Sequence, residues 1–208
     1  KKIIDQTDVY NKIIIEIGPG HGFLTDNILE RNSKKIILIE KDFKLKNILY
    51  EKYKYNKKIK IDGDDILKYN LSNFQNLIII SNLPYNISTK IILYLFNYNK
   101  NISKMIFMIQ KEVAYKFDYN LPKMNKYKFL TKVVSTFTRC FDVSSKVFIP
   151  KPKVQSTVVK FVFKNNNIDL QDAINFSKII FKNVKKKIYN NLNIKSENKM
   201  LNKRVDQL

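Results

Sequence analysis

The sequence is poor in the residues that shape loops and crosslinks. Its 208 residues include 4 Gly, 5 Pro, 1 Cys and no Trp. The single cysteine, Cys140, excludes an internal disulfide framework and is typical of a reducing compartment. No apolar run approaches the roughly 18 residues that a membrane-spanning helix needs, and the first residues show no signal or transit peptide. We therefore expect neither a disulfide-stabilised secreted module nor a membrane protein.

Acidic residues are also scarce. The chain carries 39 Lys and Arg against 18 Asp and Glu, a formal net charge of +21. Such a field favours polyanions, either nucleic acid or an anionic membrane surface. However, nearly all the basic residues are Lys, and Asn, Ile and Tyr are abundant. An AT-rich genome produces this bias without selection for binding, so nucleic acid is preferred only because the motifs below agree with the charge.

The length and the pattern of apolar runs indicate one α/β domain with a small appendage. Short β-branched runs alternate with helical segments, which predicts a mostly parallel sheet covered on both faces. Five buried strands are expected at 13–17, 35–40, 58–61, 77–80 and 104–109. Helices are expected at about 23–31, 43–53, 88–98, 110–117 and 127–137. Two late strands, antiparallel to each other, are expected at 141–147 and 155–163.

Two further features concern the ends of elements and domains. Ser88 is expected to cap the helix that it begins. After a polar break at 164–169, residues 170–208 are rich in Lys and Asn and contain neither Gly nor Pro. We therefore divide the chain into an α/β domain over 1–164 and a small helical domain over 165–208, which we expect to be truncated at its end.

A glycine-rich loop follows the first predicted strand. Residues 13–22 read Ile-Ile-Ile-Glu-Ile-Gly-Pro-Gly-His-Gly, with Gly18, Gly20 and Gly22 at every second position. The fourth glycine, Gly63, lies in the turn after the third strand, so all four occupy candidate site loops. The spacing is G-x-G-x-G and not the G-x-G-x-x-G that cradles a pyrophosphate. An ordinary tight turn is the alternative.

Acidic residues follow the first three predicted strands. Ligands of parallel sheets bind beyond the carboxyl ends of the strands, where Glu16, Glu40 and Asp64 lie. Glu40, about 20 residues after the loop, suits a ribose diol, and Asp64 could accept a hydrogen bond from an adenine amino group. Each could alternatively be a solvated loop carboxylate. A ligand with ribose, adenine and an amino-acid tail but no phosphate is S-adenosylmethionine. Its predicted binding residues are Glu16, Gly18, Gly20, Gly22, Glu40, Asp64 and Asn82.

The most specific stretch is Asn82-Leu83-Pro84-Tyr85, after the fourth strand. An exocyclic amine on a base is a poor nucleophile because its lone pair is delocalised into the ring. The Asn82 amide oxygen and the Leu83 carbonyl oxygen could accept hydrogen bonds from the two N–H groups of the amine, which would aim its lone pair at a methyl group. Pro84 fixes the turn, and Tyr85 can stack on an extruded base. The alternative is an ordinary turn with a packing tyrosine.

These motifs resemble the KsgA family of small-subunit ribosomal RNA adenine dimethyltransferases. The residues that carry the resemblance are Glu-Ile-Gly-Pro-Gly-His-Gly-Phe-Leu-Thr (16–25), Glu40 with Asp42, Gly63-Asp64, Asn-Leu-Pro-Tyr-Asn-Ile-Ser-Thr (82–89), Met-Ile-Gln-Lys-Glu-Val-Ala (108–114), Phe-Ile-Pro-Lys-Pro-Lys-Val-Gln-Ser (148–156) and Arg-Val-Asp-Gln-Leu (204–208). The resemblance implies a Rossmann-like S-adenosylmethionine-dependent methyltransferase fold, with a seven-stranded sheet and a small C-terminal helical domain that contacts RNA.

The resemblance also implies an activity and partners. Two methyl groups would be transferred to each of two adjacent adenosines in small-subunit rRNA, within a pre-ribosomal particle. By this resemblance Phe148 would stack on the target base opposite Tyr85. RNA is expected to dock on the turn with Lys151 and Lys153 and on the basic helices. The predicted contacts in those helices are Lys185, Lys186 and Lys187. We expect a monomer without a metal or a membrane partner, in the bacterial cytoplasm or an organelle (apicoplast or mitochondrial matrix) of an AT-rich organism.

The sequence departs from the family pattern at three places. The family's N-terminal Gln-Asn-Phe-Leu is not in the sequence, so we expect the numbered chain to start after it and to bind cofactor weakly. The family's Tyr-Gly-x-Leu-Ser reads Tyr-Lys-Phe-Leu-Thr from Tyr127, so Lys128 replaces a glycine. Its Arg-Arg-Lys reads Val184-Lys185-Lys186, which keeps charge but loses the bidentate geometry of arginine. His21, the only histidine, is assigned no chemistry.

Three rival functions remain open on the sequence. Erm-type methyltransferases modify large-subunit rRNA and share a similar Asn-x-Pro-Tyr loop, although the 108–114 and 204–208 motifs favour KsgA. A mitochondrial transcription factor of the same fold would bind DNA without methylation. A small-molecule or protein methyltransferase fits poorly with both the Asn-Leu-Pro-Tyr loop and the charge.

Overall fold

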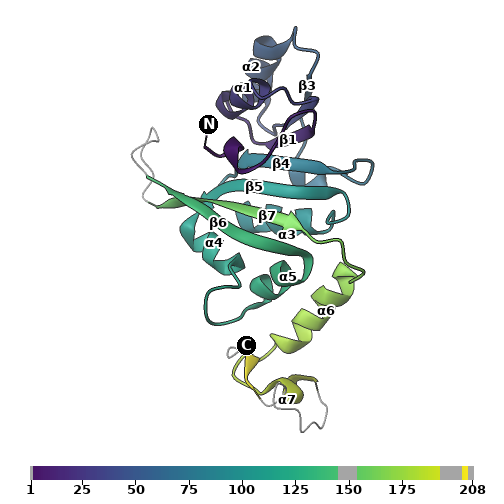
Figure 1. Cartoon of the computed structure of the whole chain (residues 1–208), viewed down its shortest axis with the longest axis vertical. Helices are drawn as coiled ribbons and strands as arrows, with labels where there is room; N and C mark the ends of the chain where they lie inside the picture. Colours follow the sequence, from purple (N-terminus) through teal and green to yellow (C-terminus); the bar gives the residue numbers. More distant parts are fainter. Residues whose placement is uncertain (1, 145–153, 193–202, 206–208) are drawn as a thin grey trace.

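One seven-stranded sheet forms the centre of the molecule (Figure 1). The computed structural model describes residues 2–144, 154–192 and 203–205. The strands lie in the order β3-β2-β1-β4-β5-β7-β6. Their bounds are β1 Ile13–Ile17, β2 Lys35–Ile39, β3 Ile59–Asp62, β4 Leu77–Asn82, β5 Ile102–Gln110, β6 Ser135–Val143 and β7 Ser156–Phe163. The first five strands pair in parallel, and β7 lies antiparallel between β5 and β6. The predicted α/β sheet is confirmed.

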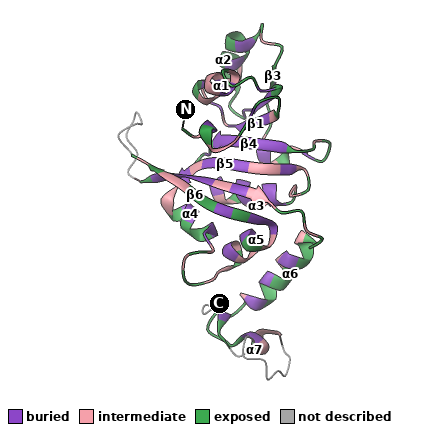
Figure 2. Cartoon of the chain, in the orientation of Figure 1, coloured by how far each residue is buried: buried purple, intermediate pink, exposed green. Residues whose placement is uncertain are grey.

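Helices connect the strands and cover the sheet. They are α1 Phe23–Leu29, α2 Phe43–Tyr53, α3 Ser88–Phe96, α4 Lys111–Phe117, α5 Lys126–Val134, α6 Leu170–Ile180 and α7 Ile188–Leu192, with short 3-10 turns η1 Ile4–Gln6 and η2 Ile66–Lys68. Alternate residues of the central strands face opposite sides: Ile15 and Ile37 join one core cluster, and Ile14 and Ile36 join the other. This explains the continuous β-branched runs, because a parallel sheet is buried on both faces (Figure 2).

Several element boundaries differ from the sequence-based expectations. The predicted helix over 127–137 ends at Val134, and β6 begins at Ser135 instead of residue 141. Ser135 is paired with Phe163 on β7, and burial alternates from Ser135 to Thr138, so edge pairing overrides the helical pattern there. Before β1, where the sequence indicates the end of a helix over residues 1–10, the described residues form only the short turn η1.

The predicted capping role of Ser88 is wrong. Ser88 is the first helical residue of α3, and Ile87 occupies the cap position without a side-chain hydrogen bond. The Ser88 hydroxyl instead donates a 3.1 Å hydrogen bond backwards to the carbonyl O of Tyr85. The serine therefore fastens the loop before the helix and not the free N–H groups of the helix.

The C-terminal helices extend away from the sheet (Figure 1). The aromatic ring of Phe129 on α5 lies 5.9 Å from that of Phe176 on α6, so α6 packs on the sheet-bearing part of the chain. Beyond it, Ile180, Ile188 and Val205 form a small core cluster of their own. The division at residue 164 stays a prediction. Within the described ranges, no helix combines the length and apolar character needed to cross a membrane.

Candidate active site

Hydrogen bonds tie the carboxyl ends of neighbouring strands into one edge. The Ser81 hydroxyl donates to the carbonyl O of Ile17, which joins the end of β4 to the end of β1. The N–H of Gly18 donates to the carbonyl O of Ile39 at 2.9 Å, and the N–H of Glu40 donates to that of Asp62 at 3.0 Å. The glycine loop and the acidic turns after β2 and β3 therefore meet at one edge, as the sequence predicted for parallel strands.

Left-handed backbone angles explain the three glycines after β1. Gly18, Gly20 and Gly22 have φ angles of 61°, 58° and 80°, which side chains rarely adopt. A Cβ at Gly18 would lie 4.0 Å from the Pro84 ring, so the glycine loop lies against the Asn-Leu-Pro-Tyr loop. A Cβ at Gly20 would meet nothing within 4 Å. The backbone at Gly20 therefore borders open space, which suits the close approach of a ligand.

Glu40 fastens the glycine loop to the end of β2. It is only 7% exposed, and its Oε2 accepts a 3.3 Å hydrogen bond from the N–H of Gly20. Its Oε1 accepts a 2.9 Å hydrogen bond from the N–H of Asp42. A carboxylate has about four acceptor sites, so both oxygens keep capacity for a ribose hydroxyl. Glu40 thus has a structural partner that the sequence did not indicate, together with its predicted ligand role.

Glu16 lies inside the protein, next to α1. It is 2% exposed, and its Oε2 accepts a 2.7 Å hydrogen bond from the Thr25 hydroxyl. Burial raises the pKa of Glu16 to about 8, although the hydrogen bond from Thr25 works in the opposite direction. A carboxyl group beside the loop is therefore largely protonated at neutral pH. A cationic neighbour, such as the charged end of S-adenosylmethionine, would favour its ionised form.

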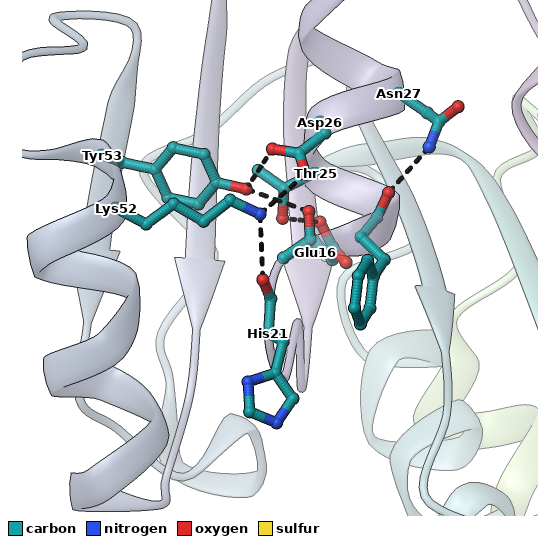
Figure 3. A network of polar contacts seen from close by, with 9 residues as sticks. Glu16, His21, Thr25, Asp26, Asn27, Lys52 and Tyr53 are labelled. Carbon is teal, nitrogen blue, oxygen red and sulfur yellow. Dashed lines mark hydrogen bonds and ion pairs between the residues drawn. The ribbon is translucent and has the colours of Figure 1, made fainter. Parts of the chain in front are cut away.

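A second network supports the far end of the glycine loop (Figure 3). The Tyr53 hydroxyl, from α2, lies 2.9 Å from the carbonyl O of Gly22 and 2.7 Å from Oδ1 of Asp26. Lys52 donates to Oδ2 of Asp26 at 2.7 Å and to the carbonyl O of His21 at 3.0 Å. Burial, aided by Asp26, raises the pKa of Tyr53, so its hydroxyl stays neutral. The network joins α1, α2 and the loop into one unit.

Most residues of this network could not be identified from the sequence. Thr25 lies in the 16–25 motif, but Lys52 and Tyr53 occur in a helix rich in Lys and Tyr, where nothing distinguishes them. Tyr53 accounts for Gly22, because a Cβ there would lie 2.3 Å from the Tyr53 hydroxyl. The imidazole of His21 points away from the carboxylates, and only its backbone joins the network (Figure 3).

Asp64 and Gly63 occupy the exposed turn after β3. This turn lies next to the end of β2, since Ile39 is paired with Asp62. A Cβ at Gly63 would lie 2.3 Å from Nζ of Lys46 on α2, the end of a flexible side chain. The turn therefore borders the same edge as Glu40, with the Asp64 side chain open to a ligand.

The Asn-Leu-Pro-Tyr loop begins where β4 ends. Asn82 is the last residue of β4 and the first exposed one after five buried positions. Leu83 is buried, and its N–H donates a 3.2 Å hydrogen bond to the carbonyl O of Met108. Tyr85 is half-buried, and its hydroxyl lies 2.7 Å from Oγ of Ser156 on β7. The loop thus presents an exposed amide at one end and an anchored aromatic ring at the other.

The predicted RNA contacts fall into two groups. Phe148, Lys151 and Lys153 lie outside the described residues. Lys185, Lys186 and Lys187 are exposed between α6 and α7, at the opposite end of the long axis of the molecule from β1–β3 (Figure 1). The structure therefore does not bring these lysines to the loops after β1 and β4. In the described part of the chain, no group of three or more His, Cys, Asp or Glu side chains could hold a metal ion.

A comparison of the sequence with known protein families identifies one that covers nearly the whole chain. A model of the family described as ribosomal RNA adenine dimethylase matches residues 1–207. The chain belongs to this family. The matched range covers both the sheet and the C-terminal helices.

Individual relatives agree with the family. The chain is 37% identical over 186 residues to the ribosomal RNA small subunit methyltransferase A of Pelagibacter ubique, covering 86% of this chain and 70% of that protein. It is 36% identical over 204 residues to that of Malacoplasma penetrans, covering 92% and 72%. At these coverages, both matches extend into the C-terminal helices of this chain.

Solved structures share the fold. A dimethyladenosine transferase from Plasmodium falciparum superposes with a TM-score of 0.83 at 21% identity, covering 100% of this chain and 89% of that one. The 23S rRNA methyltransferase ErmE superposes with a TM-score of 0.79 at 18% identity, covering 99% and 92%. At these identities the likeness concerns the fold alone.

Proposed function

We propose that this protein transfers methyl groups from S-adenosylmethionine to the N6 amines of two adjacent adenosines in small-subunit rRNA, during ribosome biogenesis. The observation that carries the proposal is the contact between two loops, since a Cβ at Gly18 would lie 4.0 Å from Pro84. The loop suited to the cofactor and the loop suited to the base amine are thus adjacent. The small-subunit methyltransferases among the relatives support the choice of substrate.

The cofactor would lie along the edge formed by β1, β2 and β3. Because Gly18, Gly20 and Gly22 have no side chains, the cofactor would approach the backbone of the glycine loop closely. Glu40 would accept hydrogen bonds from the ribose hydroxyls, and Asp64 would accept one from the adenine amine. Glu16 would supply negative charge beside the amino-acid tail. When bound, S-adenosylmethionine supplies an activated methyl group on a sulfonium centre.

The Asn-Leu-Pro-Tyr loop would prepare the amine. The Asn82 amide oxygen and the Leu83 carbonyl oxygen would accept hydrogen bonds from the two N–H groups of the amine. These hydrogen bonds favour a tetrahedral nitrogen whose lone pair points toward the methyl group. Tyr85, and Phe148 on the opposite side, would stack on the extruded base. Because the leaving group is cationic, orientation and electrostatics suffice without a strong general base.

RNA would reach the site by electrostatic docking. We propose Lys151, Lys153 and the lysines at 185–187 as phosphate contacts, with a pre-ribosomal particle as the partner and the protein acting as a monomer. The site of action would be a bacterial cytoplasm or an organelle, apicoplast or mitochondrial matrix, of an AT-rich organism.

The second candidate is methylation of large-subunit rRNA, because Erm-type methyltransferases share a similar Asn-x-Pro-Tyr loop, which here is Asn82–Tyr85. A third is DNA binding without methylation, as in a mitochondrial transcription factor.

The test uses tritiated S-adenosylmethionine with immature small subunits, large subunits and duplex DNA as separate substrates. Label recovered as N6,N6-dimethyladenosine in small-subunit RNA supports the proposal. Label in large-subunit RNA overturns it in favour of the second candidate, and DNA binding without cofactor binding favours the third.

A further inference from the structure

Tyr85 is held at both ends. Its hydroxyl lies 2.7 Å from Oγ of Ser156, and its backbone carbonyl accepts a 3.1 Å hydrogen bond from the Ser88 hydroxyl. The N–H of Ile87 donates to the carbonyl O of Pro84 at 3.3 Å, which closes the turn between them. A half-buried tyrosine anchored at its backbone and at its phenol oxygen has little freedom to rotate about its side-chain bonds.

Ser156 is a rigid anchor for this contact. It is the first residue of β7 and is 1% exposed. Its backbone is paired with Gln110 on β5 on one side and with Val143 on β6 on the other. The sheet therefore holds the backbone of Ser156 on both sides, and the contact of its hydroxyl with the Tyr85 hydroxyl ties the tyrosine ring to this held position.

Lys111 stabilises the segment immediately before Ser156. Its N–H donates to the carbonyl O of Gln155 at 3.0 Å, and its Nζ donates to Oε1 of Gln155 at 3.1 Å. Nζ also lies 2.7 Å from Oδ2 of Asp142 on β6. The ends of β6 and β7 are thus bridged by one cation at the start of α4. This bridge holds the residue immediately before Ser156.

We propose that Ser156 is a positioning residue for methyl transfer, whose hydroxyl sets the orientation of the Tyr85 ring against the target base, with Lys111 fixing the strand end that carries it. The inference rests on the proposed function. An exposed aromatic ring can stack on a base in many orientations, but transfer needs the amine in line with the methyl group. A ring locked by Ser156 presents the base in one orientation. The role is indirect, since Ser156 acts through Tyr85.

The test is a double-mutant cycle on methyl transfer to small-subunit RNA, with Ser156→Ala, Tyr85→Phe and the double variant. Each single change removes the same hydrogen bond, so each should lower kcat roughly three- to tenfold, with the KM for cofactor unchanged. The double variant should be no slower than the slower single variant. Ser156→Thr, which keeps the hydroxyl, should restore the rate. Unchanged kcat in Ser156→Ala, or losses that multiply in the double variant, would overturn the inference.

A matched control separates positioning from general destabilisation. Ser103 on β5 makes a similar bond, donating at 2.9 Å to the carbonyl O of Leu77, but at the far end of the sheet. Ser103→Ala should leave kcat unchanged. Amide hydrogen exchange gives a readout that needs no activity: exchange over residues 82–88 should rise in Ser156→Ala and not in Ser103→Ala. If the unaltered protein methylates no RNA, the proposed function fails, and the exchange result alone decides whether Ser156 anchors the loop.

Discussion

The Thr25 hydroxyl donates a 2.7 Å hydrogen bond to Oε2 of Glu16, inside the junction of β1 and α1. This single bond does not offset the loss of water around the carboxyl group, because burial raises the pKa of Glu16 to about 8. Asp26 adds to the rise, and Lys52 opposes it. Glu16 is therefore mostly protonated at neutral pH, and a cation close to it would favour its ionised form.

Glu16 gives the first prediction, a pH-dependent stability. Its folded pKa of about 8 lies above the ordinary value of 4.5, so the folded state binds a proton more tightly than the unfolded state. The resulting stabilisation is complete below about pH 4.5 and is lost as the pH rises through about 8. Glu16→Gln should therefore show a shallower fall in Tm than the unaltered protein between about pH 5.5 and 8.5. Identical pH profiles for both proteins would contradict the assigned pKa of Glu16.

The second prediction concerns the stability cost of a side chain at Gly22, where both the backbone conformation and the lack of space oppose it. Gly22→Ala forces a Cβ to within 2.3 Å of the Tyr53 hydroxyl at a φ of 80°. We expect a loss of about 1–3 kcal/mol in the free energy of unfolding, measured by denaturant titration. Gly20→Ala has a similar φ but open space, so its loss should be smaller. Adding Tyr53→Phe to Gly22→Ala should recover part of the loss; no recovery would mean that backbone strain dominates.

Asn82 gives a prediction on catalysis. Asn82→Ala removes the amide oxygen proposed to accept from the base amine, so the methylation rate should fall by on the order of 10²–10³ or to nothing. Cofactor affinity, measured by calorimetry, should fall far less than the rate, because Asn82 is only one of the seven residues predicted to bind the cofactor. Asn86→Ala, an exposed asparagine in the same loop, is the matched control and should keep the rate. A normal rate of rRNA dimethylation in Asn82→Ala would show that the catalytic assignment is wrong.

Lys128, which replaces a family glycine, gives a prediction on stability. It is 4% exposed, and its Nζ donates to the carbonyl O of Leu121 at 2.8 Å and of Pro122 at 2.7 Å. Burial lowers the pKa of Lys128, although Asp118 opposes this. Lys128→Met leaves two carbonyls without their donor and should cost about 1–3 kcal/mol in unfolding free energy. Lys132→Met, on the exposed side of the same helix, should cost much less in parallel thermal melts.

The parts of this molecule that were predictable from sequence are those set by local pattern. The β-branched runs identify the parallel strands because burial on both faces demands them, and the spaced glycines identify a loop with left-handed angles. The start of β6 at Ser135 was missed because pairing with Phe163 on β7, far along the chain, decides it. Helical and strand patterns are both compatible with residues 135–137, so only the partner strand distinguishes them.

The candidate site also contains residues that the sequence predicts and residues that only the structure identifies. Glu16, Glu40 and the Asn82–Tyr85 loop lie at the carboxyl ends of parallel strands, so strand order alone predicts that they share one edge of the sheet. The supports of that edge, Tyr53 and Ser156, lie 31 and 71 residues from their partners Gly22 and Tyr85. Tyr53 does not stand out in a sequence rich in Tyr, and Ser156 ends the 148–156 motif without any indication of its partner. Only the folded chain shows that these two residues make the contacts.

The basic segment between α6 and α7 gives a prediction on RNA docking. Lys185 and Lys186 are exposed, so Lys185→Ala/Lys186→Ala should weaken binding to small-subunit rRNA without loss of stability. If both contact phosphates, the slope of log affinity against log salt should fall by about 1.4–1.8. The matched control is Lys34→Ala/Lys35→Ala, which removes the same charge from exposed positions at the start of β2. Filter binding over a salt series measures both. Equal loss in the two variants would mean that the chain attracts RNA by net charge alone, because a docking site at Lys185 and Lys186 requires a larger change there than elsewhere.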